Sequence, residues 1–96
     1  LPDFDPREGL AGSTLIELFA WSEDEFLRRT EGSPIRRIGH ERWLRNMAVA
    51  MGNALRVADD PAVRSALAQH LQHPSATVRE HVVWALAQAA SVRVEA

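Results

Sequence analysis

The chain has 96 residues, of which 46% are hydrophobic and 25% are charged, values typical of one globular domain. It contains no cysteine, which excludes disulfides, thiolate metal sites, iron–sulfur clusters and cysteine nucleophiles within these residues. No apolar run reaches the ~18–20 residues that cross a bilayer, and no signal-peptide pattern opens the chain. We therefore expect no membrane contact.

The start of the chain has the composition of a linker. It opens on Leu1, not Met, and Pro2 and Pro6 stand among acidic residues. Proline and acidic residues without helical periodicity are typical of a connecting segment. We expect residues 1–13 to be a linker from a longer protein, and residues 14–96 to be a single all-helical domain.

The net charge of −2 conceals an uneven distribution. Residues 3–25 carry seven acidic side chains against one arginine, a local charge of −6. Residues 28–45 carry six arginines against two glutamates, a local charge of +4. The net charge therefore says nothing about nucleic acid, whereas its distribution directs attention to the second segment.

Helix signals are dense and strand signals are nearly missing. Ser22 with Glu25 fits a capping box, Trp21 and Phe26 hold the positions of a hydrophobic staple, and Gly32 provides a stop. The complete set of predicted helical segments is about 14–20, 22–30, 34–38, 40–52, 61–72 and 76–90.

Four boundaries depend on single residues. Thr14, paired with Glu17, is expected to cap the first helix. Gly52 is expected to end the fourth segment. Asp60 is expected to cap the fifth, which begins with a proline, and Ser75 the sixth.

The pattern of the 40–52 helix returns 34 residues later in the last helix. The matched pairs are Leu44 and Val78, Arg45 and Arg79, Ala48 and Val82, and Met51 and Ala85. A period of this length is typical of solenoids built from helical pairs. We therefore predict an all-α fold, a short HEAT-like helical-repeat bundle of about five helices.

No constellation of residues indicates catalysis. Most acidic residues stand at predicted helix starts, where the helix dipole explains them, and a serine nucleophile would need a strand–turn–helix elbow. His70, His73 and His81 lack carboxylate or cysteine partners at metal-ligand spacing. We expect no catalytic residue and no metal ligand, and we expect protonated His70 to favour the nearby helix end.

The basic segment is the strongest candidate for binding. Arg36 and Arg37 stand at a predicted helix start, where backbone N–H groups and guanidinium groups suit phosphate oxygens. Arg42 and Arg45 are three apart in the next helix and can reach one target. Together with Asn46, they could grip a nucleic-acid backbone and sense a sugar or base edge.

A structural explanation of these arginines stays open. Arg45, Arg64 and Arg79 each follow a Val or Leu, a position from which arginines often tie neighbouring repeats together, and exposed charge is usually only solvated. Arginines that point outward together would favour binding, whereas pairs with Glu31 or Glu41 would favour the structural explanation. Trp21 and Trp43 are expected in the core.

Four stretches carry a more specific pattern: LIELFAWSEDEF at 15–26, TEGSPIRRIG at 30–39, RWLRN at 42–46 and MGN at 51–53. With these stretches, segment 15–53 resembles the C-terminal part of epoxyqueuosine reductases, bacterial enzymes that act last in queuosine synthesis on tRNA. The HEAT-like pattern over 61–90 is commoner and adds less.

The resemblance implies a cytoplasmic parent enzyme that reduces the epoxide of epoxyqueuosine with cobalamin and two [4Fe–4S] clusters. The cluster cysteines lie upstream in such proteins, so no cofactor is expected in this chain. What the resemblance implies here is a non-catalytic module that packs beside the upstream catalytic core and helps to bind the tRNA anticodon stem-loop. The alternative is a structural or protein-interaction domain that packs on that core without contacting RNA. The residues that match the family's basic stretch, and so the expected RNA contacts, are Arg36, Arg37, His40, Arg42, Arg45 and Asn46.

Overall fold

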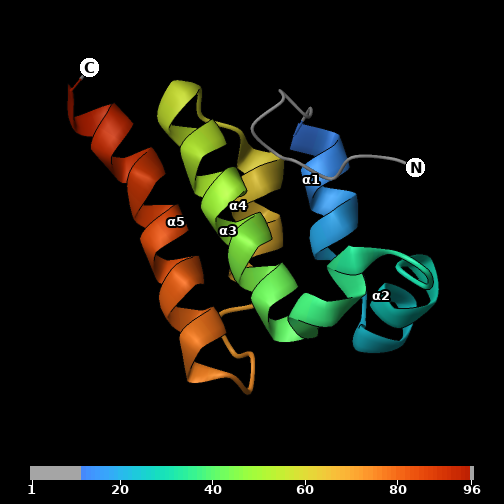
Figure 1. The fold of residues 1–96 in the computed structure, drawn as a ribbon. Coiled ribbons are helices and arrows are strands. Elements are labelled where there is room, and N and C mark those ends of the chain that lie inside the picture. Colours follow the sequence, from blue (N-terminus) through green and yellow to red (C-terminus); the bar gives the residue numbers. More distant parts are fainter. Residues whose placement is uncertain (1–11, 96) are drawn as a thin grey trace.

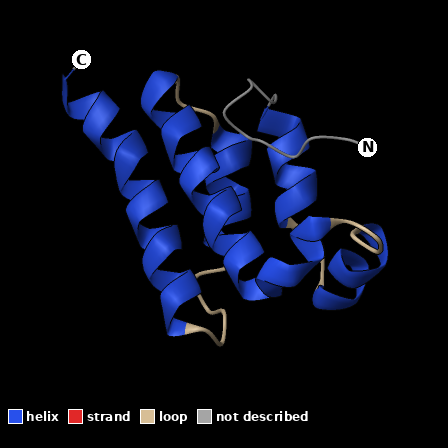
Figure 2. Cartoon of the chain, in the orientation of Figure 1, coloured by secondary structure: helices blue, strands red, loops and turns tan. Residues whose placement is uncertain are grey.

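The computed structural model describes the backbone of residues 12–95 and the side-chain surroundings of residues 14–89. Helices and their connections make up all of the described backbone, without a strand (Figures 1 and 2), which confirms the predicted all-α class. Most of the predicted linker, residues 1–11, lies outside the described residues. The elements are α1 Gly12–Phe19, α2 Glu23–Arg29, the 3₁₀-helix η2 Pro34–Ile38, α3 Gly39–Val57, α4 Pro61–Ala68 and α5 Ala76–Glu95.

Helix α3 is the centre of the arrangement, because it contacts each of the other described elements. It lies beside α5, and the two helices run in the same direction (Figure 1). Helices α1 and α4 contact each other and pack on α3 from another side, while α2 and η2 cover its N-terminal end. The core is therefore built around the buried face of α3.

The 34-residue repeat read from the sequence has a structural counterpart. The apolar members of the matched pairs, Leu44 and Val78, Ala48 and Val82, and Met51 and Ala85, are all fully buried. The Glu41 carboxylate accepts a hydrogen bond from the Ser75 hydroxyl, which is also 34 residues away. Helices α3 and α5 are thus equivalent positions of two stacked units, and the HEAT-like label itself stays a prediction.

The predicted end of α3 at Gly52 is wrong. The helix continues to Val57, and Gly52 is buried inside it. A Cβ at this position would lie 2.6 Å from Trp84 Cζ3 and 2.9 Å from Ala85 Cα. Glycine stands here because the backbone of α5 approaches closely, and not because the helix stops.

Three other boundaries also differ from the prediction. Helix α1 begins at Gly12, so Thr14 lies within the helix and does not cap it. Helix α4 ends at Ala68, four residues early, because the chain tightens into i→i+3 hydrogen bonds such as Leu71 N–H to the Ala68 carbonyl (3.1 Å). Helix α5 extends to Glu95, beyond the predicted end at residue 90.

The predicted caps at Ser22, Asp60 and Ser75 are confirmed. Ser22 Oγ accepts from the Glu25 N–H (3.2 Å), Asp60 Oδ1 from the Ala62 N–H (3.0 Å), and Ser75 Oγ from the Val78 N–H (3.2 Å). Each satisfies a backbone donor that the helix start leaves free. The Glu25 carboxylate, however, binds Arg28 and Arg29 in the same helix.

An aromatic cluster joins α1, α2 and α3. Trp43 is buried, its Nε1–H donates to the Leu18 carbonyl (3.1 Å), and its ring stacks on Trp21 with centroids 5.3 Å apart. The Phe26 ring is tilted against Trp43 at 5.4 Å. The expected core position of Trp43 is confirmed, and Trp21 is half-buried at the edge of the cluster.

Candidate nucleic-acid interface

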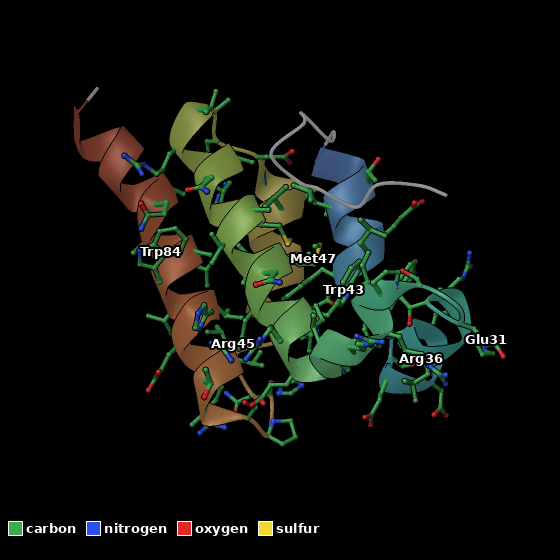
Figure 3. The ribbon with its side chains drawn as sticks, viewed as in Figure 1. Glu31, Arg36, Trp43, Arg45, Met47 and Trp84 are labelled. Atoms are coloured by element: carbon green, nitrogen blue, oxygen red, sulfur yellow. The ribbon has the colours of Figure 1, made fainter. Side chains whose placement is uncertain are left out.

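The six predicted contact residues fall into three different settings. Arg36 and Arg37 lie in η2, where both side chains are exposed. Ser33 caps this short helix by accepting from the Ile35 N–H (3.2 Å), and Gly39 ends it with φ +86°. Neither arginine forms an ion pair with any side chain in the part of the chain that the structure describes. Figure 3 shows Arg36 at the end of the molecule formed by α2 and η2.

His40 points into the protein. Its Nε2–H donates to the Trp21 carbonyl (2.8 Å), and its ring lies 5.8 Å from that of Phe26. The side chain is half-buried. These contacts tie the start of α3 to the aromatic cluster, so the structure places His40 among the packing residues and away from the exposed arginines.

Arg42 and Asn46 are exposed and one helical turn apart on α3. The same face continues through further exposed residues, and we name the set the α3 ridge: Arg42, Asn46, Val49, Asn53 and Arg56. These positions follow helical spacing and so form one stripe. Residues 42–58 contain three arginines and no acidic residue, which makes the ridge a positive surface with amide groups between its charges.

Asn53 and Arg56 were missed from the sequence because α3 was expected to end at Gly52. The signal that could have found them is the exposed-residue spacing itself. The interval from Arg42 to Asn46 repeats from Val49 to Asn53, on the side opposite the apolar stripe of α3. The ridge therefore continues to Arg56, ten residues beyond Asn46, the last residue of the predicted site.

Arg45 differs from Arg42 although it is only three residues away. Its side chain is half-buried, and Figure 3 places it on the side of α3 that faces α5. Its Nε is buried and has no hydrogen-bond partner among the described residues. Arg45 therefore lies on the α5 side of α3, and the predicted arginines do not all point to one target.

Glu31 and Glu41, the nearest glutamates in sequence, form no ion pair with the predicted contact arginines among the described residues. Glu41 binds the Ser75 hydroxyl, and Glu31 is exposed at the α2–η2 end (Figure 3). Within residues 14–89, the ion pairs of the other arginines are local: Arg28 and Arg29 with Glu25, and Arg64 with Asp59 (2.8 Å). The Arg29 hydrogen bond and the nearby Arg28 charge lower the pKa of Glu25.

Arg79, which lies 34 residues after Arg45 in the repeat, also forms its hydrogen bonds locally. Its Nη1–H groups donate to the carbonyls of His73 and Pro74 (3.1 Å for the latter) in the turn before α5. Arg64 and Arg79 thus brace their own helix starts and do not tie neighbouring units together. The unpaired arginines Arg36, Arg37 and Arg42 stand apart from this group.

His70 occupies a small open cavity between α1 and α4, which is also lined by Ile16, Phe19, Ser65 and Gln69. Its ring centroid is 4.1 Å from that of Phe19. Burial lowers the pKa of His70, although the Ala66 carbonyl acts in the opposite direction. The helix end does favour protonated His70 through the Ala66 carbonyl, but desolvation of the charged ring outweighs this contribution and the pKa is lowered overall.

The described residues do not fit the cofactors that the resemblance implies. They contain no group of three His, Asp or Glu side chains able to hold a metal ion. The chain has no thiolate for an iron–sulfur cluster, because it has no cysteine. Cluster ligands would have to come from another part of a longer polypeptide. None of the helices in residues 12–95 combines the length and the hydropathy needed to cross a bilayer.

The fold and its surface define an all-α domain with exposed arginines on η2 and α3. Comparison with known proteins identifies it further. The chain is 64% identical over 92 residues to an epoxyqueuosine reductase of Alicycliphilus denitrificans, covering 92% of this chain and 26% of that protein. It is 62% identical to the enzyme of Xanthomonas campestris (91% and 24%) and 54% identical to that of Escherichia coli (90% and 22%).

The matches fall in the C-terminal region of these proteins, and the chain spans about a quarter of their length. The chain belongs to the epoxyqueuosine reductase family and corresponds to that C-terminal region. No protein-family model matches it, and no solved structure matches it.

Proposed function

We propose that this chain is the non-catalytic C-terminal module of a cytoplasmic epoxyqueuosine reductase, and that it helps to bind the anticodon stem-loop of the tRNA substrate. The reduction itself, with cobalamin and two [4Fe–4S] clusters, would take place in the remainder of the polypeptide. The observation that carries the proposal is the set of exposed arginines that have no acidic partner among the described residues, Arg36, Arg37 and Arg42, in a chain with this family membership.

The physical argument rests on what an unpaired arginine does at a surface. A guanidinium group that is not held by a carboxylate can donate two parallel hydrogen bonds to a phosphate. Contacts of this kind position RNA without reading its sequence. Asn46 lies one turn after Arg42 on the α3 ridge, where its amide can reach a sugar or a base edge.

The structure narrows the proposed contact set. His40 is committed to the Trp21 carbonyl, and Arg45 is half-buried beside α5. We therefore assign phosphate contacts to Arg36, Arg37 and Arg42, with Asn46 beside them. His40 would act indirectly, because it fixes the start of α3 against the aromatic cluster.

The test is a titration of the full-length reductase with an anticodon stem-loop at several salt concentrations. The variant carries Arg36→Ala, Arg37→Ala and Arg42→Ala. Each lost phosphate contact is expected to lower the slope of log affinity against log salt by about 0.7–1. Weaker binding with a slope lower by about 2–3 would support the proposal.

A matched control removes arginines that already have a partner. Arg28→Ala and Arg64→Ala delete exposed or half-exposed guanidinium groups that bind Glu25 and Asp59. These changes are expected to leave the salt slope near its original value. If the triple variant binds as tightly as the unchanged enzyme, with its circular dichroism intact, the module instead packs on the catalytic core without contacting RNA.

A further inference from the structure

Trp84 is the most exposed tryptophan among the described residues. It is 40% exposed, whereas Trp43 is 2% exposed and Trp21 is half-buried. It lies on α5 (Figure 3), outside the aromatic cluster of α1, α2 and α3. The exposed part of this indole is available to a partner.

The ring of Trp84 is held against α3 at one defined place. Its Cζ3 atom lies 2.6 Å from the position that a Cβ of residue 52 would take, so the ring packs this closely because residue 52 is a glycine. Gly52 precedes Asn53 and follows Val49 by one turn, and both of these belong to the α3 ridge. The indole therefore borders the ridge from the α5 side, with one edge packed against Gly52 and 40% of the residue's surface exposed.

The charges around this position are unevenly placed. Helix α3 carries Arg45 on its α5 side and Arg42 and Arg56 on the ridge, and no acidic residue occurs between positions 42 and 58. On α5, the exposed Glu80 stands one turn before Trp84. A ligand with separate anionic and aromatic parts would place its anionic part over α3 and its aromatic part over α5.

We infer that Trp84 is a stacking platform for an unpaired nucleobase, next to phosphate contacts on the α3 ridge. This inference deepens the function proposed above and rests on it. RNA provides both parts of the ligand, because every nucleotide joins a phosphate to a flat base. Stacking on an aromatic side chain is the common way in which proteins hold single-stranded bases. A ring that Gly52 keeps in place loses little side-chain freedom on binding.

The test compares two RNA probes with the full-length reductase. One probe is an anticodon stem-loop with unpaired bases, and the other is a fully paired RNA duplex of the same length. Trp84→Leu keeps an apolar side chain beside Gly52 but removes the aromatic ring. It is expected to weaken stem-loop binding by roughly five- to hundredfold, to leave the salt slope unchanged, and to leave duplex binding nearly unchanged.

The neighbouring Val83 supplies a matched control. It is 57% exposed on α5, so Val83→Ala removes exposed apolar surface one residue away. Stem-loop affinity is expected to stay the same in this variant. Photo-crosslinking of stem-loop RNA containing 4-thiouridine provides a measurement that needs no substitution, and the crosslink is expected at Trp84 by mass spectrometry.

The outcomes separate this inference from the proposed function. If the arginine triple variant weakens binding but Trp84→Leu does not and no crosslink forms at Trp84, the stacking platform is refuted and the proposed function stands. If neither variant changes RNA binding, the proposed function fails first. Equal losses with the stem-loop and the duplex would also overturn the inference, because a paired duplex offers no base to stack.

Discussion

At Gly52, intrinsic helix propensity and packing oppose each other. An alanine in the middle of a helix is favoured over glycine by about 1 kcal/mol. Here, however, the added Cβ would lie 2.9 Å from Ala85 Cα, a backbone atom that cannot turn away. Overpacking of this kind costs about 1–3 kcal/mol. We therefore expect Gly52→Ala to lower the melting temperature of the chain, measured by circular dichroism.

The adjacent Asn53 gives the comparison that isolates packing. It is exposed on the same turn of α3, so Asn53→Ala gains helix propensity without meeting α5. Its melting temperature is expected to stay level or to rise slightly. A Gly52→Ala chain that melts above the unchanged chain would show that α5 can shift without cost, and that close approach does not explain this glycine.

The lowered pKa of His70 makes the stability of the chain depend on pH. Burial lowers the pKa of both His70 and His73 in the folded chain below the ordinary value of 6.5. The unfolded chain then binds protons at a higher pH than the folded chain does. The free energy of unfolding therefore has its highest value above about pH 6.5 and falls as the pH drops below it. We expect urea denaturation to give a lower free energy of unfolding at pH about 5.5 than at about 7.5.

Replacing the buried histidine tests the cause of this slope. His70→Gln cannot gain a proton in this range, so the difference between the two pH values is expected to shrink. Glu25 does not confuse the measurement, because its pKa is lowered from 4.5 and its carboxylate stays ionised throughout the window. A pH dependence that is unchanged in His70→Gln would assign the slope to other groups.

At the scale of the elements, the sequence was sufficient to predict a helix start wherever neighbouring residues fix that start. The caps at Ser22, Asp60 and Ser75 were predictable because each side chain binds a backbone N–H two or three residues ahead. The continuation of α3 past Gly52 was not predictable, because this glycine is required by its close contact with Ala85 of α5, 33 residues later in sequence. A glycine that makes room for a distant helix has no local signal that distinguishes it from a glycine that ends a helix.

The candidate interface shows the same division. The exposure of Arg42 and Asn46 follows from their position on α3 opposite its apolar stripe. The inward turn of His40 did not, because its partner is the Trp21 carbonyl, 19 residues earlier. The position of Trp84 beside the α3 ridge likewise required the parallel contact of α3 and α5. Sequence therefore located the basic stretch but not its shape.

At the scale of the whole molecule, the central place of α3 makes a prediction about cooperativity. One side of α3 carries the aromatic cluster with Trp21 and Trp43, and another packs along α5 with Trp84. Because Leu44, Ala48 and Met51 are buried within a single core cluster, loss of either side would expose apolar surface on the other. We therefore expect the chain to unfold as one unit.

The two ends can be followed separately in denaturant. In a Trp84→Phe variant, fluorescence reports only on Trp21 and Trp43, whereas far-ultraviolet circular dichroism reports on all helices, including the long α5. The two transitions are expected to share one midpoint and one slope. A helical transition that precedes the fluorescence change would mean that α4 and α5 unfold alone. The stacked units would then behave as the loosely coupled repeats of a solenoid, and the contact at Gly52 would be too weak to join the aromatic end to the α5 face.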